Sequence, residues 1–241
     1  MTTPQKAAKV KVEPDVTALP DITDSEKAAM TSFKHLAFTG IVRDLFMHFG
    51  EPADAVFMGE RYLVDRLDLP PSERRIPDLL IAFNANVALM ERQNGYVIAD
   101  QGKSPDFILE VGSPSTRRED VGRKRDDYAR MGVLEYWRFD EEDSPNVVKL
   151  AGDRLVGGSY EPMPISALEE GALEGCSPVL NLCLRWEQGK LRWYDPANAR
   201  YVLTAEDYAL AARGYAERAG QAEARARELE EQLRRHGIEP V

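Results

Sequence analysis

The stretch PDFILEVGSPSTRREDVGRKRDDYARM, residues 105–131, decides which fold and which site the sequence predicts. Its run DFILEVG predicts a strand that carries one carboxylate, Glu110, in its middle. A hydroxyl-rich turn follows, and a helix is expected from about Glu119 to Met131, stopped by Gly132. This helix sets Lys124 among its apolar positions. A buried acid near a buried cation costs stability, so chains that keep such a pair usually use it.

Two further apolar runs flank this stretch. IPDLLIAF (76–83) is nearly continuous, which is typical of a central strand covered on both faces, and Asp78 is its one charge. VLEYWRFD (133–140) predicts another strong strand. Together with a helix expected to end at Phe49, these elements describe a mixed α/β layer. The segment 84–104 is expected to be irregular. Shorter strands, forming a β-rich extension of the same domain, are expected at 146–151, 154–160 and 190–194.

Glu110 needs a partner from another strand if it is to hold a metal ion. Alternate side chains of a strand share a face, so Asp106 points the same way as Glu110 but lies about 13 Å from it. One Mg²⁺ at about 2.1 Å from each oxygen cannot bridge that gap. Asp106 is therefore expected to be a strand-entry residue. Asp78 is the better partner, because neighbouring strands lie under about 5 Å apart.

Lys124 is predicted to face the sheet. Val121, Lys124, Tyr128 and Met131 fall on a single stripe of the expected helix, and no other face of that helix is apolar. A lysine on an inward stripe is expensive unless it is paired. The alternative is that its long stem lets the ammonium group reach solvent at the start of the helix.

This constellation suits metal-dependent phosphodiester hydrolysis. A Mg²⁺ ion held by two carboxylates polarises the phosphoryl oxygen and lowers the pKa of a bound water. Lys124 would steady the attacking hydroxide or the developing negative charge. The sequence contains no HExxH, no P-loop, no GxGxxG after a strand and no Cys/His cluster, which argues against the chemistries that depend on those motifs.

The composition is that of a soluble globular protein. The chain has 241 residues, of which 43% are hydrophobic and 30% charged. The N-terminal sequence lacks the apolar core of a secretory signal, and no apolar run approaches the roughly 18 residues that a membrane span needs. Cys176 and Cys183 have no metal-ligand spacing and suggest no disulfide framework. A reducing cytoplasm is the expected compartment.

The net charge of −10 argues against nucleic-acid binding, because such binders usually show a basic footprint. Binding depends on the local field, however, and basic residues flank the expected site. The alternative is that they are ordinary solvated charges offset by neighbouring acids. The basic residues concerned are Arg74, Arg75, Arg117, Arg118, Arg123, Lys124 and Arg125.

Three segments are expected along the chain. Residues 1–24 are a disordered tail by composition, and 25–195 form the globular domain. In 204–236, apolar residues from Tyr208 to Leu233 alternate steps of four and three, which is the heptad seam of a coiled coil. The region is therefore expected to join chains into a homo-oligomer. The alternative is a single helix lying back on the domain.

At the site residues the sequence resembles the Uma-type endonucleases, a bacterial family of the restriction-endonuclease-like PD-(D/E)XK superfamily. The resemblance implies a mixed sheet flanked by helices, with Asp78 and Glu110 holding Mg²⁺ or Mn²⁺ and Lys124 as the catalytic lysine. It also implies the backbone carbonyl of Val111 as a third metal ligand. One departure stands out, since Gly112 occupies the position of the superfamily's usual lysine. The matching pieces are Pro77-Asp78, Glu110–Thr116, Asp120, Lys124, Tyr128, Gly132-Val133 and Glu135–Trp137.

Three functions remain open from the sequence. The first is a metal-dependent DNA endonuclease that uses Asp78, Glu110 and Lys124. The second is a catalytically inactive nuclease-like module that serves as an adaptor and dimerises through 204–236, which the acidic net charge and Gly112 favour. The third is a hydrolase of a small phosphorylated substrate, which would need no basic groove.

Overall fold

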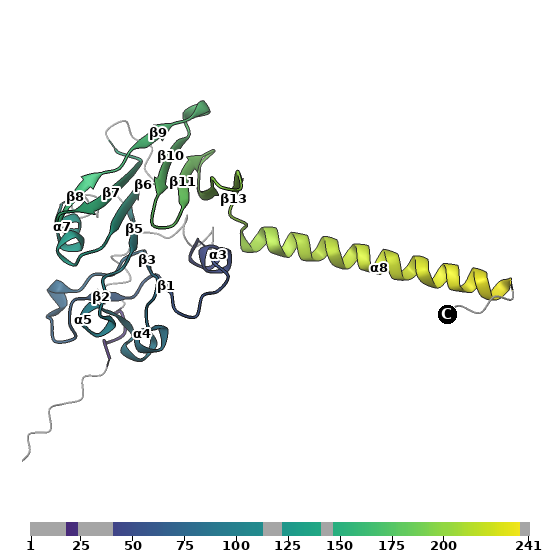
Figure 1. The fold of residues 1–241 in the computed structure, drawn as a ribbon, viewed down its shortest axis with the longest axis horizontal. Coiled ribbons are helices and arrows are strands. Elements are labelled where there is room, and N and C mark those ends of the chain that lie inside the picture. Colours follow the sequence, from purple (N-terminus) through teal and green to yellow (C-terminus); the bar gives the residue numbers. More distant parts are fainter. Residues whose placement is uncertain (1–17, 24–40, 113–121, 141–146, 237–241) are drawn as a thin grey trace, which may run out of the picture.

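The computed structural model describes residues 18–23, 41–112, 122–140 and 147–236, and is built on a six-stranded mixed sheet (Figure 1). The strand order is β1-β3-β5-β6-β7-β8. β5 and β6 run parallel and the other neighbours run antiparallel, which confirms the predicted mixed α/β class. The strands are β1 (Val56–Met58), β3 (Leu79–Ala82), β5 (Phe107–Gly112), β6 (Glu135–Asp140), β7 (Leu150–Val156) and β8 (Ser159–Pro162).

The centre of this sheet is covered on both faces. Every residue of β3 and β5 is buried, as their continuous apolar runs predicted. The predicted alternation is also confirmed, because Leu109 packs in one core cluster while Leu80 and Ile108 pack in the other. Glu110 belongs by this alternation to the face of Ile108.

A second, five-stranded antiparallel sheet packs on the first. Of the predicted β-rich extension, only the strand expected at 190–194 lies in this second sheet. The strands expected at 146–151 and 154–160 correspond to β7 and β8 of the first sheet, and the break expected between them falls inside β7. Trp137 of β6 lies between the sheets, and its ring leaves no room for a side chain at Gly152 of β7 or Gly175 of β10. A Cβ at either glycine would lie under 3.0 Å from the ring. The strands, in the order β13-β12-β11-β10-β9, are β9 (Ile165–Ala167), β10 (Leu173–Ser177), β11 (Leu182–Glu187), β12 (Lys190–Asp195) and β13 (Arg200–Tyr201).

The prediction of an irregular segment at 84–104 is wrong. It holds two short helices, α4 (Val87–Gln93) and α5 (Ile98–Gln101), and β4 (Gly95–Val97), which pairs in parallel with β2 (Tyr62–Val64). Two single-turn 3₁₀ helices lie in loops and are η1 (Pro71–Glu73) and η2 (Glu169–Gly171).

The N-terminal boundary needs a correction. Residues 18–23 lie within the expected disordered tail, yet Leu19 is buried against Tyr62 and Val97 and its backbone N–H donates to Gln93 O at 2.7 Å. The tail remains a prediction for residues 1–17 and for residue 24, which lie outside the described ones. Of the helix expected to end at Phe49, the structure describes α3 (Ile41–His48).

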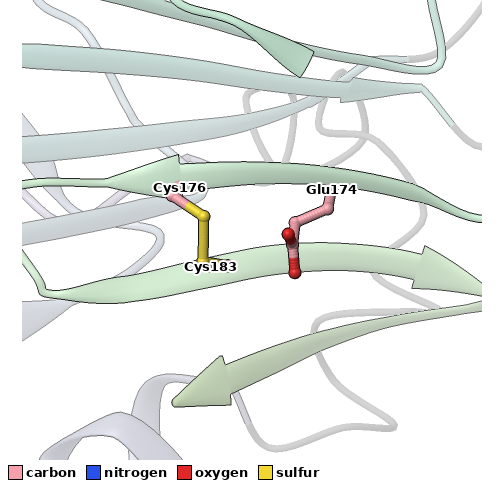
Figure 2. Close-up of side chains that lie close together, drawn as sticks. All are labelled: Glu174, Cys176 and Cys183. Atoms are coloured by element: carbon pink, nitrogen blue, oxygen red, sulfur yellow. A yellow bond between two sulfur atoms is a disulfide. The ribbon is translucent and has the colours of Figure 1, made fainter. Parts of the chain in front are cut away.

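The two cysteines form a disulfide, so the expectation of no disulfide was wrong (Figure 2). Cys176 of β10 and Cys183 of β11 lie directly opposite each other in the antiparallel register. Their sequence separation of seven residues is closed by the turn between the two strands. A disulfide is uncommon in a reducing compartment, and the expected cytoplasmic location stays a prediction.

The C-terminal helix α8 (Ala205–Arg235) extends away from both sheets (Figure 1). It begins with a capping box, since the Thr204 side chain accepts from Asp207 N and the Asp207 carboxylate accepts from Thr204 N. All of its residues are described and none is buried. The alternative of a helix lying back on the domain is therefore wrong. In the described part of the chain, no helix is long and apolar enough to cross a membrane.

Candidate functional site

Asp78 and Glu110 meet across two central strands. The register pairs Leu79 with Leu109, so one step further Asp78 lies opposite Glu110, on the same face. Asp78 Oδ2 accepts a hydrogen bond of 2.6 Å from Val111 N, beyond the point where the β3–β5 ladder ends. Both carboxylic residues are buried. The strand geometry therefore brings together the two acids that the sequence paired.

Helix α7 (Arg123–Arg130) brings Lys124 to this pair. Lys124 Nζ lies 3.0 Å from Glu110 Oε2, and the lysine side chain keeps 19% of its surface exposed while that of Glu110 keeps 3%. The predicted inward stripe is confirmed for Tyr128 and Met131, which are buried, whereas Val121 lies outside the described residues. Lys124 thus joins a buried acid to the solvent side of the site.

Tyr128 is a site residue that sequence reasoning left among the packing residues. Its hydroxyl donates to Glu110 Oε1 at 2.6 Å, opposite the oxygen that Lys124 contacts. Burial raises the pKa of Tyr128 well above its ordinary value, and the charges of Glu110 and Asp78 raise it further. The hydroxyl therefore stays protonated and keeps donating. The available signal was its position four residues after Lys124, one helical turn along the same stripe.

The donor set fits a hard cation. Val111 N–H points to the edge of β5 that faces Asp78, and the carbonyl of the same residue points to the same edge of the strand. Two carboxylates and a backbone carbonyl are the oxygen ligands that Mg²⁺ prefers. Gly112 is the last residue of β5, and a lysine reaches Glu110 from α7 instead of from the strand.

Asp106 lies outside this group, as expected for a strand-entry residue. Its Oδ2 accepts from Phe83 N at 2.7 Å and pairs with Lys103 Nζ at 2.6 Å. It therefore caps the far end of β3 rather than the end that holds Asp78.

Two of the expected basic residues are engaged in structural ion pairs. Arg75 Nε donates to Asp127 at 2.9 Å, and Arg125 donates to Asp153 at 3.0 Å. Their charges are offset by acids, as the alternative predicted, but the pairs are partly buried rather than solvated, and Asp153 is not a sequence neighbour of Arg125. Arg123, at the start of α7, keeps 65% of its side chain exposed and lies 3.8 Å from the same Asp127 carboxylate. Arg117 and Arg118 lie outside the described residues.

A second group of potential ligands lies on the other sheet. Within the described residues, ligand atoms of Glu174, Cys176 and Cys183 fall within 4.8 Å of one another (Figure 2). The two sulfur atoms are bonded to each other, and Glu174 pairs with Arg185. While the disulfide is intact, its two sulfur atoms are not available to a metal.

Paired acids on central strands of a mixed sheet, with a lysine supplied by a covering helix, define a nuclease-like α/β domain. The chain belongs to the Uma2 family, whose model is described as "Putative restriction endonuclease" and matches residues 28–204, more than half of the 241 residues. The resemblance seen in the sequence is thereby confirmed. A nuclease family implies a nucleic-acid substrate.

Comparison with solved structures gives a distant similarity. A crystal structure described as "a putative nuclease belonging to DUF820" from Anabaena variabilis matches with a TM-score of 0.39 and 15% sequence identity. The match covers 58% of this chain and 74% of that chain. No curated protein matches this sequence significantly.

Proposed function

We propose that the chain is a divalent-metal-dependent DNA endonuclease, with Asp78, Glu110 and the carbonyl of Val111 as metal ligands and Lys124 as the catalytic lysine. The observation that carries the proposal is the 3.0 Å contact between Lys124 Nζ and Glu110 Oε2, on the face that Asp78 shares. Membership of a nuclease family supports the same reading.

Each side chain has a distinct role in this proposal. Bound Mg²⁺ or Mn²⁺ would supply Lewis-acid activation of the phosphoryl oxygen and of a water. Asp78 and Glu110 present oxygen atoms on one face of the sheet. Tyr128 holds one oxygen of Glu110 by donating to it, which orients the carboxylate. Lys124 places a positive charge at the solvent edge of the site, where negative charge develops in the transition state.

Plasmid cleavage tests the proposal. Wild-type protein is expected to nick plasmid DNA with Mg²⁺ or Mn²⁺ and to stop when EDTA removes the metal. Asp78→Asn and Lys124→Met are each expected to lower the rate at least 100-fold, in the range reported for removing one charge-stabilising group. Lys190→Met is the matched control, because Lys190 is exposed on β12, and it is expected to cleave at the wild-type rate. Equal trace activity in wild type and Asp78→Asn would refute the endonuclease.

A non-catalytic adaptor is the second candidate. The engagement of Arg75 and Arg125 by Asp127 and Asp153 favours it, because these arginines offer little charge to DNA. Calorimetry with Mn²⁺ separates the candidates. The endonuclease is expected to bind Mn²⁺ in a manner that Glu110→Gln abolishes, whereas an adaptor need not bind metal at Glu110.

A further inference from the structure

Helix α8 carries an apolar seam that nothing in the described chain covers. The helix has 31 residues, about 46 Å at the helical rise, and contributes no residue to any core cluster. Tyr215 keeps 70% and Leu229 keeps 52% of its surface exposed. The seam is Tyr208, Ala212, Tyr215, Ala219, Ala222, Ala226, Leu229 and Leu233, which fall at alternate steps of four and three.

The charges beside the seam are segregated by sign. In the heptad that the seam defines, Ala219 and Ala226 are a positions, Ala222 and Leu229 are d positions, and Tyr215 is the preceding d position. The residues just before the a positions, the g positions, are Arg218 and Arg225. The residues just after the d positions, the e positions, are Glu223 and Glu230. One edge of the seam is therefore basic and the other acidic.

We infer that α8 binds the α8 of a second copy of this chain as a parallel, two-stranded coiled coil. In a parallel pair each g position lies beside the partner's e position five residues further on. Arg218 then meets the partner's Glu223, and Arg225 meets the partner's Glu230, twice over by symmetry. An antiparallel pair places g beside g and e beside e, which sets arginine against arginine and glutamate against glutamate. Both directions close with two-fold symmetry, so the charge pattern decides between them.

Within one copy, the glutamates on the acidic edge of the seam form only exposed ion pairs along their own helix. Glu223 pairs with Arg227 at 3.5 Å and Glu230 with Arg234 at 3.7 Å, but these are exposed pairs one turn apart. Such exposed pairs add little to the stability of a helix, because solvent screens them. They leave the apolar seam uncovered, whereas a second helix covers the seam and adds a partner for each glutamate.

The parallel direction has a consequence for the domains. Each globular domain joins α8 at its N-terminal end, so a parallel coil places both domains at the same end of the assembly. An antiparallel coil would place them about 46 Å apart at opposite ends. This inference stands on α8 alone and holds whether or not the domains cleave DNA.

Sedimentation equilibrium of the full chain tests the seam. Wild type is expected to be a dimer, and Leu229→Glu is expected to weaken dimerisation at least ten-fold. Leu210→Glu is the matched control, because Leu210 is 72% exposed on the same helix but lies off the seam, and it is expected to stay dimeric. A monomeric wild type would overturn the inference. So would equal weakening by the two variants, which would indicate general hydrophobic association.

Oxidative cross-linking of Leu229→Cys tests the direction. In a parallel pair the two copies of residue 229 face each other at a d layer, so a covalent dimer is expected. In a fully overlapping antiparallel pair they lie about 27 Å apart and do not cross-link. Leu210→Cys controls for random collision and is expected to remain uncross-linked. A dimer in which Leu229→Cys fails to cross-link would overturn the parallel arrangement.

Discussion

At the scale of single residues, the site is an acid held from two sides by one helix. Lys124 and Tyr128, one turn apart on α7, contact different oxygens of Glu110. The carboxylate is therefore fixed in orientation before any metal or substrate arrives. The ring of Tyr128 packs in turn against that of Tyr136, with centroids 5.1 Å apart and planes tilted by 52°, so its hydroxyl has little freedom to turn away.

Removing the Tyr128 hydroxyl should loosen the metal site more than the fold. Tyr128→Phe keeps the ring packing but deletes the donor to Glu110 Oε1, and we expect Mn²⁺ to bind about ten-fold more weakly by calorimetry, the lower range for outer ligand partners. Tyr160→Phe is the control, because its hydroxyl also makes a buried bond, to Val133 O. It should lose similar stability, about 1 kcal/mol, without changing Mn²⁺ affinity. Wild-type Mn²⁺ affinity in Tyr128→Phe would contradict the orienting role.

Most of this site could be predicted from the sequence because it follows from local periods. The spacing along a strand showed that Asp106 lies too far from Glu110 to bind the same ion. The apolar stripe of the helix showed that Lys124 faces the sheet. The role of Tyr128 was missed because the sequence does not show whether the hydroxyl of a tyrosine on an apolar stripe makes a hydrogen bond. The ion pairs of Arg75 and Arg125 join segments far apart in sequence, and periodicity contains no information on them.

At the scale of elements, long segments with a clear apolar pattern were predicted and short segments were missed. The central strands were predicted because their nearly continuous apolar runs are a strong local signature. α4 was missed because it has only seven residues, between the cap Asn86 and the left-handed Asn94. The disulfide was missed because β10 and β11 were not predicted, so nothing in the sequence showed that Cys176 and Cys183 would face each other.

The junction of α3 with α8 should make stability depend on pH. Asp44 of α3 is buried and its Oδ1 accepts from Ala205 N at 3.0 Å, at the start of α8. Burial raises the pKa of Asp44 to about 6, although the Ala205 hydrogen bond lowers it. The unfolded chain releases this proton near pH 4. The native state therefore holds more protons between about pH 4 and 6, and the contribution of Asp44 to stability falls as pH rises through that window.

Asp44→Asn should remove this dependence, because the amide keeps an oxygen acceptor for Ala205 N but does not titrate. Measured by urea unfolding, the stability of Asp44→Asn relative to wild type is expected to rise between pH 4.5 and pH 7.5. Asp54→Asn is the control at an exposed carboxylate, and it should retain the wild-type pH dependence. An unchanged difference between Asp44→Asn and wild type across the two pH values would contradict the assignment.

At the scale of the whole molecule, the two sheets are joined by a buried polar clasp as well as by apolar packing. Glu135, fully buried in β6, accepts from Trp137 Nε1 at 3.0 Å, from Ser177 Oγ at 2.6 Å and from Val179 N at 3.0 Å. The first donor belongs to its own strand and the others come from the end of β10 and the turn after it. The Glu135–Trp137 piece of the family resemblance thus has a structural use. Sequence periods could not reveal it, because the partners lie 42 and 44 residues away.

Neutralising this clasp should cost stability without touching the chemistry. In Glu135→Gln an amide NH₂ replaces one acceptor oxygen and meets a donor, and the charge that strengthened the remaining bonds is lost. We expect the free energy of unfolding to fall by about 2–3 kcal/mol in denaturant titrations. Glu161→Gln, at an exposed glutamate of β8, should change it by no more than about 0.5 kcal/mol. Glu135 lies on the Phe107 face of the sheet, opposite Glu110, so cleavage per folded molecule should match wild type. Equal stability of Glu135→Gln and wild type would show that apolar packing around Trp137 holds the sheets together without the clasp.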